Sequence, residues 1–237
     1  MTERVYLDEP DTPKLTATVL ASRAAGIVLD RTVFYARGGG QPGDTGVLRW
    51  AGGETVIIDT VKGEGAEILH QPAPNAVPPP AGTIVEAVID WQRRHALMRM
   101  HTTLHLLCSL IKGAAVTGGS IGAEKSRLDF DLPASPAKEA IEADLNALIA
   151  ADHKVSIGWV DESVLDTDPG LVRTMSVQPP RGSGRLRLIR IGEADAPVDL
   201  QPCGGTHVSR TGEIGPMRVA KIENKGKQNR RIIIAPG

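Results

Sequence analysis

Two short motifs that stand far apart in the sequence constrain the fold of this chain more than any other feature. The first is His101-Thr-Thr-Leu-His105, within a segment (residues 94–111) whose apolar residues recur at helical spacing. A helix places two histidines with this spacing on one face, where they can share a metal ion. The second is Cys203-Gly-Gly-Thr-His207, whose glycines permit the tight turn that lets thiol and imidazole converge. One thiolate and three imidazoles suit zinc in number and type, so the sequence predicts one zinc ion held by both motifs.

The chemistry of such a zinc site depends on how many protein ligands stay bound. Four protein ligands are typical of a closed, structural zinc, whereas a catalytic zinc keeps one position open. If one ligand is loose, the metal can orient substrate or activate water, and we expect His207 to be the loose one. Cys108 is a rival ligand, because it follows His105 by three residues on the same helical face. The alternative, which we favour, is that Cys108 is a small buried hydrophobic residue.

Residues 1–90 are predicted to form β structure. Short β-type segments recur at even intervals, at residues 15–20, 26–30, 46–50, 55–61, 67–71 and 83–89. The third and fourth are joined by Ala51-Gly-Gly-Glu54, which is typical of a hairpin. Strands this short and evenly spaced indicate a small barrel or sandwich, and we predict a β-barrel domain. The proline-rich linker at residues 71–81 is expected to be an extended, exposed connection.

A glycine-rich stretch, Ala-Arg-Gly-Gly-Gly-Gln-Pro-Gly-Asp-Thr-Gly, lies within this domain at residues 36–46. It is not a phosphate-binding P-loop, because no Gly-Lys-Ser/Thr closes it, and it is not a dinucleotide fingerprint, because no helical pattern follows. Two interpretations stay open. The stretch is either a mobile hairpin loop or a loop whose backbone approaches a ligand, with Arg37, Gln41 and Asp44 as its polar tips.

Residues 91–237 are predicted to form an α+β domain in which helices pack on one face of a mostly antiparallel sheet. After the histidine helix, a second helix is expected to begin at Ser135-Pro136, with serine as N-cap and proline at the first helical position. Strands are expected at residues 126–131, 155–159 and 185–190, and in a terminal hairpin near residues 217–235. The whole chain is therefore predicted to be α+β, with a small N-terminal β-barrel followed by a two-layer domain that carries the zinc motifs.

The two halves of the chain differ in charge. Residues 1–90 carry 7 basic and 12 acidic side chains, whereas residues 91–237 carry 20 and 16. Basic residues gather in a row of arginines before the cysteine motif and in the last hairpin, which contains Lys225, Lys227 and Arg230. Beside a metal site such charges suit a phosphate backbone, and the alternative is an ordinary solvated face.

The remaining features bear on compartment and on the other histidines. The two cysteines, Cys108 and Cys203, are not expected to pair, which fits a reducing cytosol. No signal-peptide pattern is evident, and no apolar stretch approaches the roughly 18 residues of a membrane span. We therefore expect a cytoplasmic protein without a membrane partner. We expect His70 and His153 at the surface and His95 on the helix, without a functional role.

Five stretches together resemble the alanyl-tRNA editing proteins of the AlaX group, which are similar to the editing domain of alanyl-tRNA synthetase but free-standing. They are Gly-Gly-Gly-Gln-Pro-Gly-Asp-Thr-Gly at 38–46, His-Thr-Thr-Leu-His at 101–105, Glu-Lys-Ser-Arg-Leu-Asp-Phe at 124–130, Gln-Pro-Cys-Gly-Gly-Thr-His-Val at 201–208 and Lys-Ile-Glu-Asn-Lys-Gly at 221–226. They span nearly the whole chain, as in the medium-length subgroup. The resemblance implies a zinc-dependent hydrolase that deacylates alanine tRNA mischarged with serine or glycine. It implies tRNA as the partner and argues against aminoacylation and ATP use.

The resemblance also assigns roles to residues at matching positions. The zinc ligands that it implies are His101, His105, Cys203 and His207. It places the glycine-rich loop near the acceptor end of the tRNA and Thr102 in the amino-acid pocket. There, Thr102 and the zinc ion are the candidate partners of the serine hydroxyl. The family's first motif often has alanine where this chain has Thr103. The editing domain of the synthetase carries a glutamine before its Gly-Ser, and residues 118–120 of this chain, Gly-Gly-Ser, have none. The preference between serine and glycine therefore stays open.

Two rival functions compete with ester hydrolysis. A metalloprotease would carry a glutamate as general base directly after the first histidine, and Thr102 at that position argues strongly against it. A zinc-stabilised tRNA-binding module without catalytic activity belongs to a different class. The sequence does not separate that module from an enzyme, and a deacylation assay would.

Overall fold

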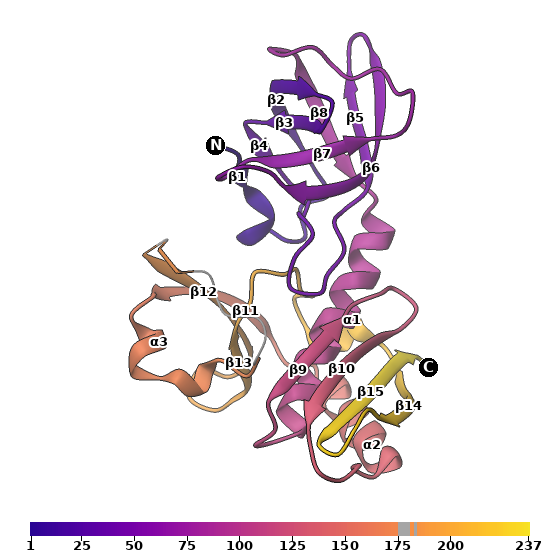
Figure 1. Ribbon diagram of the computed structural model, residues 1–237, viewed down its shortest axis with the longest axis vertical. Helices are drawn as coiled ribbons and strands as arrows, with labels where there is room; N and C mark the ends of the chain where they lie inside the picture. Colours follow the sequence, from indigo (N-terminus) through magenta and orange to yellow (C-terminus); the bar gives the residue numbers. More distant parts are fainter. Residues whose placement is uncertain (175–180, 183) are drawn as a thin grey trace. The chain divides into compact units, whose positions relative to one another are not determined.

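The structure is a computed structural model that describes residues 1–174, 181–182 and 184–237 (Figure 1). The chain divides into two compact units, Met1–His95 and Ala96–Gly237, and the boundary falls inside the long helix α1 (Trp91–Leu110). The first unit contains a closed barrel, and the second contains antiparallel sheets and helices. The predicted α+β class with an N-terminal barrel is therefore confirmed.

The first unit is built around a closed barrel of six strands, in which every neighbouring pair is antiparallel. In barrel order the strands are β2 (Lys14–Arg23), β3 (Gly26–Leu29), β7 (Ile68–Pro72), β6 (Gly53–Lys62), β5 (Gly46–Trp50) and β8 (Ile84–Ile89). Because side chains alternate between the two faces of a strand, one set from each strand fills the barrel, including the buried Val19, Leu48 and Ala87. A short parallel pair, β1 (Glu3–Arg4) with β4 (Arg31–Thr32), and the 3-10 turn η1 (Val5–Leu7) complete the unit.

The proline-rich stretch at residues 71–81 is a loop of this barrel. Its first two residues end β7, and the remainder runs as mostly exposed irregular backbone to β8. Two hydroxyls fasten it to the strands: Thr55 Oγ1 donates to the Val77 carbonyl at 2.5 Å, and Ser22 Oγ donates to the Pro79 carbonyl. The loop therefore follows the barrel wall.

His70 is completely buried in the barrel, so the prediction that it lies at the surface is wrong. Its Nδ1 lies 2.9 Å from the Ile27 carbonyl, which can only accept a hydrogen bond, so Nδ1 carries the proton. Its Nε2 then accepts from the hydroxyl of Thr32 at 2.8 Å. Burial lowers the pKa of His70 to about 4, even though the bond to Ile27 opposes this shift. The ring is therefore a neutral part of the core.

The described residues of the second unit contain two separate sheets, with strand orders β14-β15-β10-β9 and β11-β12-β13, and every neighbouring pair is antiparallel. The bounds of its elements are β9 (Val116–Ser120), β10 (Ser126–Asp131), α2 (Lys138–Ala150), β11 (Val155–Asp161), α3 (Val164–Thr167), η2 (Pro169–Leu171), β12 (Arg185–Gly192), β13 (Pro197–Pro202), η3 (Thr211–Ile214), β14 (Met217–Asn224) and β15 (Asn229–Pro236). The prediction of one sheet is therefore wrong. Two strands escaped prediction because β9 contains paired glycines and β13 begins and ends with proline, which are loop signals.

The N-terminus of helix α2 differs from the prediction. Helix α2 begins at Lys138 with Ala137 as N-cap, and no side chain caps it, so the predicted start at Ser135 is wrong. Ile141, Leu145 and Ile149 are buried and form the apolar stripe of this helix. No helix in the described part of the chain combines the length and the apolar character that crossing a membrane requires.

Candidate metal centre

The two predicted motifs meet in the second unit. Residues His101 and His105 occupy successive turns of α1, and Cys203 and His207 lie in the turn that follows β13. One ligand atom from each of these four residues lies within 4.8 Å of every other. The three imidazoles are buried, and Cys203 is half-buried. The fold therefore brings together all four residues that were predicted to bind zinc.

The spacing of the ligand atoms fits a small tetrahedral ion. The Cys203 Sγ lies 3.5 Å from Nε2 of His101 and 3.3 Å from Nε2 of His207. A zinc ion with ordinary bonds to nitrogen and sulfur would separate these ligand atoms by about 3.5 Å, which is the edge of the tetrahedron. Three imidazoles and one thiol are also a donor set that zinc prefers. Both the residue types and their separations fit zinc.

Hydrogen bonds on the far side of one imidazole fix its orientation. Nδ1 of His105 lies 2.8 Å from Oδ2 of Asp199, a buried carboxylate of β13. Because a carboxylate accepts, Nδ1 donates, and Nε2 is the atom of His105 that can bind a metal. The other carboxylate oxygen of Asp199 accepts from Nε2 of Gln201 at 2.8 Å.

A second imidazole is held by the threonine inside the first motif. Thr102 Oγ1 donates to the Met98 carbonyl at 3.0 Å, which leaves its two lone pairs as acceptors. It accepts from Nδ1 of His207 at 3.2 Å and from the Val208 N–H at 3.3 Å. These three bonds use the whole capacity of a hydroxyl group, and Thr102 is fully buried. The geometry therefore favours a Thr102 that orients His207, in contrast to the predicted contact with a substrate hydroxyl.

The charges of the cluster follow from this geometry. Burial by itself raises the pKa of the Cys203 thiol, but the imidazoles of His101 and His207 outweigh it and hold that pKa well below its usual range. Burial opposes the charged form of His105, yet Asp199 and Cys203 raise its pKa to about 10. Burial, with His101 beside it, holds the pKa of His207 well below its ordinary value. The lowered pKa favours the thiolate form of Cys203, which is the form that binds metals.

The turn that carries the second motif is held by a buried arginine. The guanidinium Nη1 of Arg187 donates to the carbonyls of Cys203 at 2.5 Å and Gly205 at 3.0 Å. The Cys203 N–H in turn donates to the Arg187 carbonyl at 3.2 Å. This arginine, predicted as part of a basic row, therefore shapes the metal centre through the backbone.

The rival ligand Cys108 lies outside the quartet of ligand atoms. It is buried, and burial together with the carboxylate of Asp199 raises the pKa of its thiol to about 12. A neutral thiol in the helix interior behaves as a small hydrophobic residue. The geometry thus favours the packing role that we expected for Cys108.

Sequence reasoning missed Asp199 and Gln201. Both lie at alternating positions of β13, just before Cys203, so a strand assignment would have placed the two side chains on one face. That signal was hidden because the segment reads Pro197-Val-Asp-Leu-Gln-Pro202, with a proline at each end.

In the first unit, the glycine-rich loop directs two of its three predicted polar tips inward. Gln41 and Asp44 are each 1% exposed. The Asp44 carboxylate accepts from Nε of Arg94 at 2.9 and 3.1 Å and from the Tyr35 N–H at 2.7 Å, and it also pairs with Nη2 of Arg94. The Asp44 carboxylate therefore fastens the loop to Arg94 in the first turn of α1, and neither Asp44 nor the buried Gln41 is accessible to RNA.

The exposed part of this loop is Arg37 to Gly40, apart from the half-buried Gly38. Arg37 forms an ion pair with Asp59 at the surface. Gly39 has φ +57° and has no neighbour within reach of an added Cβ. A Cβ at Gly43 would lie 2.1 Å from the Thr60 carbonyl, so only glycine fits where the loop returns. The loop is therefore fastened at its base, and its bare backbone is exposed at its tip.

The three basic residues predicted to bind RNA differ in exposure at the turn between β14 and β15. Lys225 and Lys227 are exposed, and Lys225 Nζ pairs with Glu223 at 2.8 Å. Arg230 is buried and donates to Asn224 Oδ1 at 2.9 Å and to the Gly226 carbonyl at 2.8 Å. The two lysines are thus exposed at the surface, whereas Arg230 stabilises the turn that carries them.

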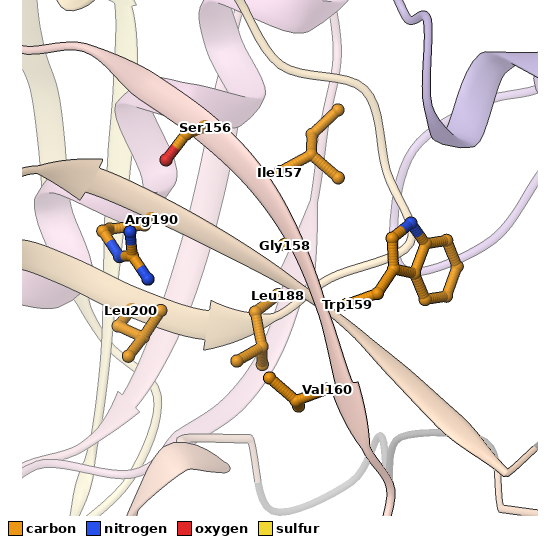
Figure 2. Close-up of a pocket in the computed structure, with 8 residues that line it drawn as sticks. All are labelled: Ser156, Ile157, Gly158, Trp159, Val160, Leu188, Arg190 and Leu200. Atoms are coloured by element: carbon orange, nitrogen blue, oxygen red, sulfur yellow. The ribbon is translucent and has the colours of Figure 1, made fainter. Parts of the chain in front are cut away.

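A cavity of about 160 Å³ lies on the sheet β11-β12-β13. Figure 2 shows Ile157 and Trp159 on the opposite side of β11 from Val160 and Leu188. The cavity is lined by Leu200, the neighbour of Asp199 in β13, and adjacent side chains of a strand point to opposite faces. This cavity and the carboxylate that contacts His105 therefore lie on different faces of the sheet.

Family models match both parts of the chain. Residues 5–93 match the model of class II (A) tRNA synthetases. Residues 186–233 match the second additional domain of threonyl- and alanyl-tRNA synthetases, and this match contains Cys203 and His207.

Whole-chain relatives fall into two groups. The alanyl-tRNA editing protein AlaX-M of Methanosarcina mazei is 34% identical over 244 residues, which cover 98% of this chain and 95% of that protein. The AlaX-M protein of Saccharolobus solfataricus is 33% identical over 236 residues, with 98% of each chain covered. The alanine–tRNA ligase of Pyrobaculum arsenaticum is 36% identical over 248 residues, but this chain spans only 27% of its length. The similarity to the AlaX-M proteins thus extends over both units.

Proposed function

Because the chain belongs to the AlaX family of alanyl-tRNA editing proteins, we propose that it is an aminoacyl-tRNA deacylase. Its proposed substrate is alanine tRNA that carries serine by mistake, with glycine as a second mischarged amino acid. The observation that carries the proposal is the converging ligand quartet, in a chain that is similar to editing proteins over nearly its whole length. The proposed cofactor is one zinc ion, held by His101, His105, Cys203 and His207.

The proposed reaction breaks the ester bond between the amino acid and the terminal ribose of the tRNA. The oxygen of a water molecule attacks the carbonyl carbon, the ribose oxygen leaves, and a proton from the water passes to that oxygen. The products are the free amino acid and a tRNA with a free hydroxyl. An aminoacyl ester needs little activation, so positioning of the water and stabilisation of the oxyanion suffice. When bound, the zinc ion would supply a Lewis acid at the pocket.

The proposed discrimination between serine and alanine rests on one hydroxyl group. An apolar pocket sized for alanine cannot strongly reject serine, which adds only that hydroxyl. A second site built to hydrogen-bond the hydroxyl discriminates far better, because alanine would leave its polar partners unpaired. Since the hydroxyl of Thr102 is already saturated, we assign Thr102 to holding His207 and place the recognition of serine on another group.

The proposed RNA contacts are the exposed ones among the predicted residues. Lys225 and Lys227 lie in an exposed turn, where a phosphate can replace Glu223 as the partner of Lys225. The exposed backbone beside Arg37 suits close approach to a nucleotide. Charge attraction of this kind positions an RNA without reading its sequence.

The alternative function is a zinc-stabilised tRNA-binding module without activity. One observation favours it: His207, which we expected to be the loose ligand, is buried and anchored by Thr102. Four permanent protein ligands are typical of a structural zinc. In that case the ion shapes the pocket, and any hydrolysis depends on the surrounding residues alone.

Side-by-side deacylation separates these functions. Alanine tRNA charged with serine, glycine or alanine is mixed with the purified full-length chain, and release of each amino acid is followed over time. We expect fast release of serine and little release of alanine, and Cys203→Ala should abolish the difference. Binding of the tRNA without release of any amino acid would leave the binding module as the function.

A further inference from the structure

Asp199 has no role in the proposed reaction, yet both of its carboxylate oxygens are engaged beside the metal centre. It is 2% exposed and lies on β13, two strand positions before Gln201 and four before Cys203. Oδ2 accepts from Nδ1 of His105 at 2.8 Å, and Oδ1 accepts from Nε2 of Gln201 at 2.8 Å. The carboxylate is therefore fixed on one side by its own strand and fixes a helix residue on the other.

We infer that Asp199 is a positioning residue that prepares His105 to bind the metal ion, and that Gln201 holds Asp199 in place for this task. A carboxylate that accepts from Nδ1–H fixes the tautomer and the rotation of the imidazole, and it makes Nε2 a stronger donor to the metal. The inference rests on the proposed zinc site and extends it to residues outside the ligand quartet.

The placement of Asp199 also joins the two motifs. Asp199 and Gln201 share one face of β13, because side chains alternate along a strand, and Cys203 directly follows the last residue of that strand. The strand that orients His105 of α1 is therefore the one that leads into the cysteine ligand. A shift of β13 relative to α1 would move Cys203 and the orienting carboxylate together, so this contact couples the positions of His105 and Cys203.

The test compares zinc affinity among variants of the full-length chain. Asp199→Asn keeps the side-chain volume and removes the charge, whereas Asp199→Ala removes the whole carboxyl group. Each purified protein competes for zinc with a chromophoric chelator, and circular dichroism establishes that it is folded. We expect both variants to bind zinc about 10- to 100-fold more weakly than the wild type, and Gln201→Ala to weaken zinc binding less.

Two control variants separate this role from general stability. Asp129→Asn removes another largely buried carboxylate, which bonds Arg231 at 2.8 and 2.9 Å in the other sheet of the unit. Cys108→Ala changes a buried side chain on α1, one turn from His105. Both should keep the wild-type zinc affinity. Wild-type affinity in folded Asp199→Asn and Asp199→Ala, or an equally weakened affinity in Asp129→Asn, would overturn the inference.

The visible absorption spectrum of the cobalt-substituted protein provides a second measurement, which a change in stability alone does not affect. Cobalt in place of zinc has visible absorption bands that report ligand geometry, and a separate band reports its bond to the thiolate. In Asp199→Asn the geometry bands should shift while the thiolate band persists, and Asp199→Glu should restore part of the affinity. An unchanged cobalt spectrum in Asp199→Asn would contradict a positioning role.

These measurements contain no RNA, so their outcome is independent of deacylation. A wild type that binds zinc but releases no amino acid would overturn the proposed function and leave the role of Asp199 standing. A wild type that does not bind zinc would overturn both.

Discussion

The hydroxyl oxygen of Thr102 and Nδ1 of His207 lie 3.2 Å apart, so a residue of α1 orients an imidazole from the turn after β13. Asp199 makes the reciprocal contact, from the strand to His105 of the helix. Each segment therefore orients a metal-binding residue of the other. The two contacts differ in chemistry, since one partner is a neutral hydroxyl and the other is a carboxylate.

Replacement of Thr102 by valine tests whether it serves architecture or recognition. Thr102→Val removes the acceptor of His207 Nδ1–H and leaves that group buried and unpaired, which costs about 1 to 3 kcal/mol. We expect the rates on seryl and glycyl esters to fall by about the same factor, because the substitution acts through the metal centre. Thr102→Ser keeps the hydroxyl and should retain most of the activity. A reduced rate on the serine ester alone would restore Thr102 to the amino-acid pocket.

Metal analysis tests the ligand set directly. Protein purified without added zinc should contain close to one zinc per chain, and this content should drop in His101→Ala and Cys203→Ala. Cys108→Ala is the matched cysteine control, and its zinc content should be unchanged. Full zinc retention in both ligand variants would disprove the site, and loss of zinc in Cys108→Ala would make that cysteine a ligand.

The exposed lysines of the last hairpin should contribute to RNA affinity in proportion to the phosphate charge that they neutralise. Lys225→Glu and Lys227→Glu together should weaken tRNA binding. The slope of log affinity against log salt should flatten by about one unit for each phosphate group that the variant no longer neutralises. The control is Arg230→Ala, since Arg230 donates to the carbonyls of the turn. Arg230→Ala should lower the stability of the protein and leave the slope of log affinity against log salt unchanged. A slope that the two lysine changes leave unaltered would assign them to a solvated face.

The buried histidine of the barrel should make the first unit sensitive to mild acid. His70 has its pKa lowered to about 4 by burial, so the unfolded chain binds a proton below its ordinary pKa while the folded chain does not. The stability present above pH 6.5 should therefore fall between about pH 6.5 and pH 4, by up to about 3 kcal/mol. His70→Gln should flatten this part of the urea-unfolding profile. An equally steep acid dependence in His70→Gln would refute this origin.

Local sequence patterns predicted the features that depend on one segment of the chain alone. Alternation of apolar residues marked the barrel strands, and the spacing of His101 and His105 marked two imidazoles on one helical face. The quartet as a whole was also predictable, because zinc needs about four such ligands and few other residues offered them.

The sequence patterns did not predict which distant residue each buried polar side chain hydrogen-bonds. His70 looks like a surface residue until Thr32 and Ile27, distant in sequence, are placed against its two nitrogens. Asp44 looks like the tip of a loop until Arg94 meets its carboxylate inside the unit. In both cases burial depends on a tertiary contact that no periodicity encodes, and the division of the second unit into two sheets was hidden in the same way.

The ligands come from two chain positions that are far apart: α1 supplies a pair of them, and the turn after β13 supplies the other pair. An ion bound by all four would close a covalent loop of roughly 100 residues, as a disulfide does, and such closures restrict the unfolded chain. The segment inside the loop includes β9, β10, α2 and all three strands of the smaller sheet. Chelation would thus release a cross-link, and the intervening segment would become the part of the chain that proteases cut first.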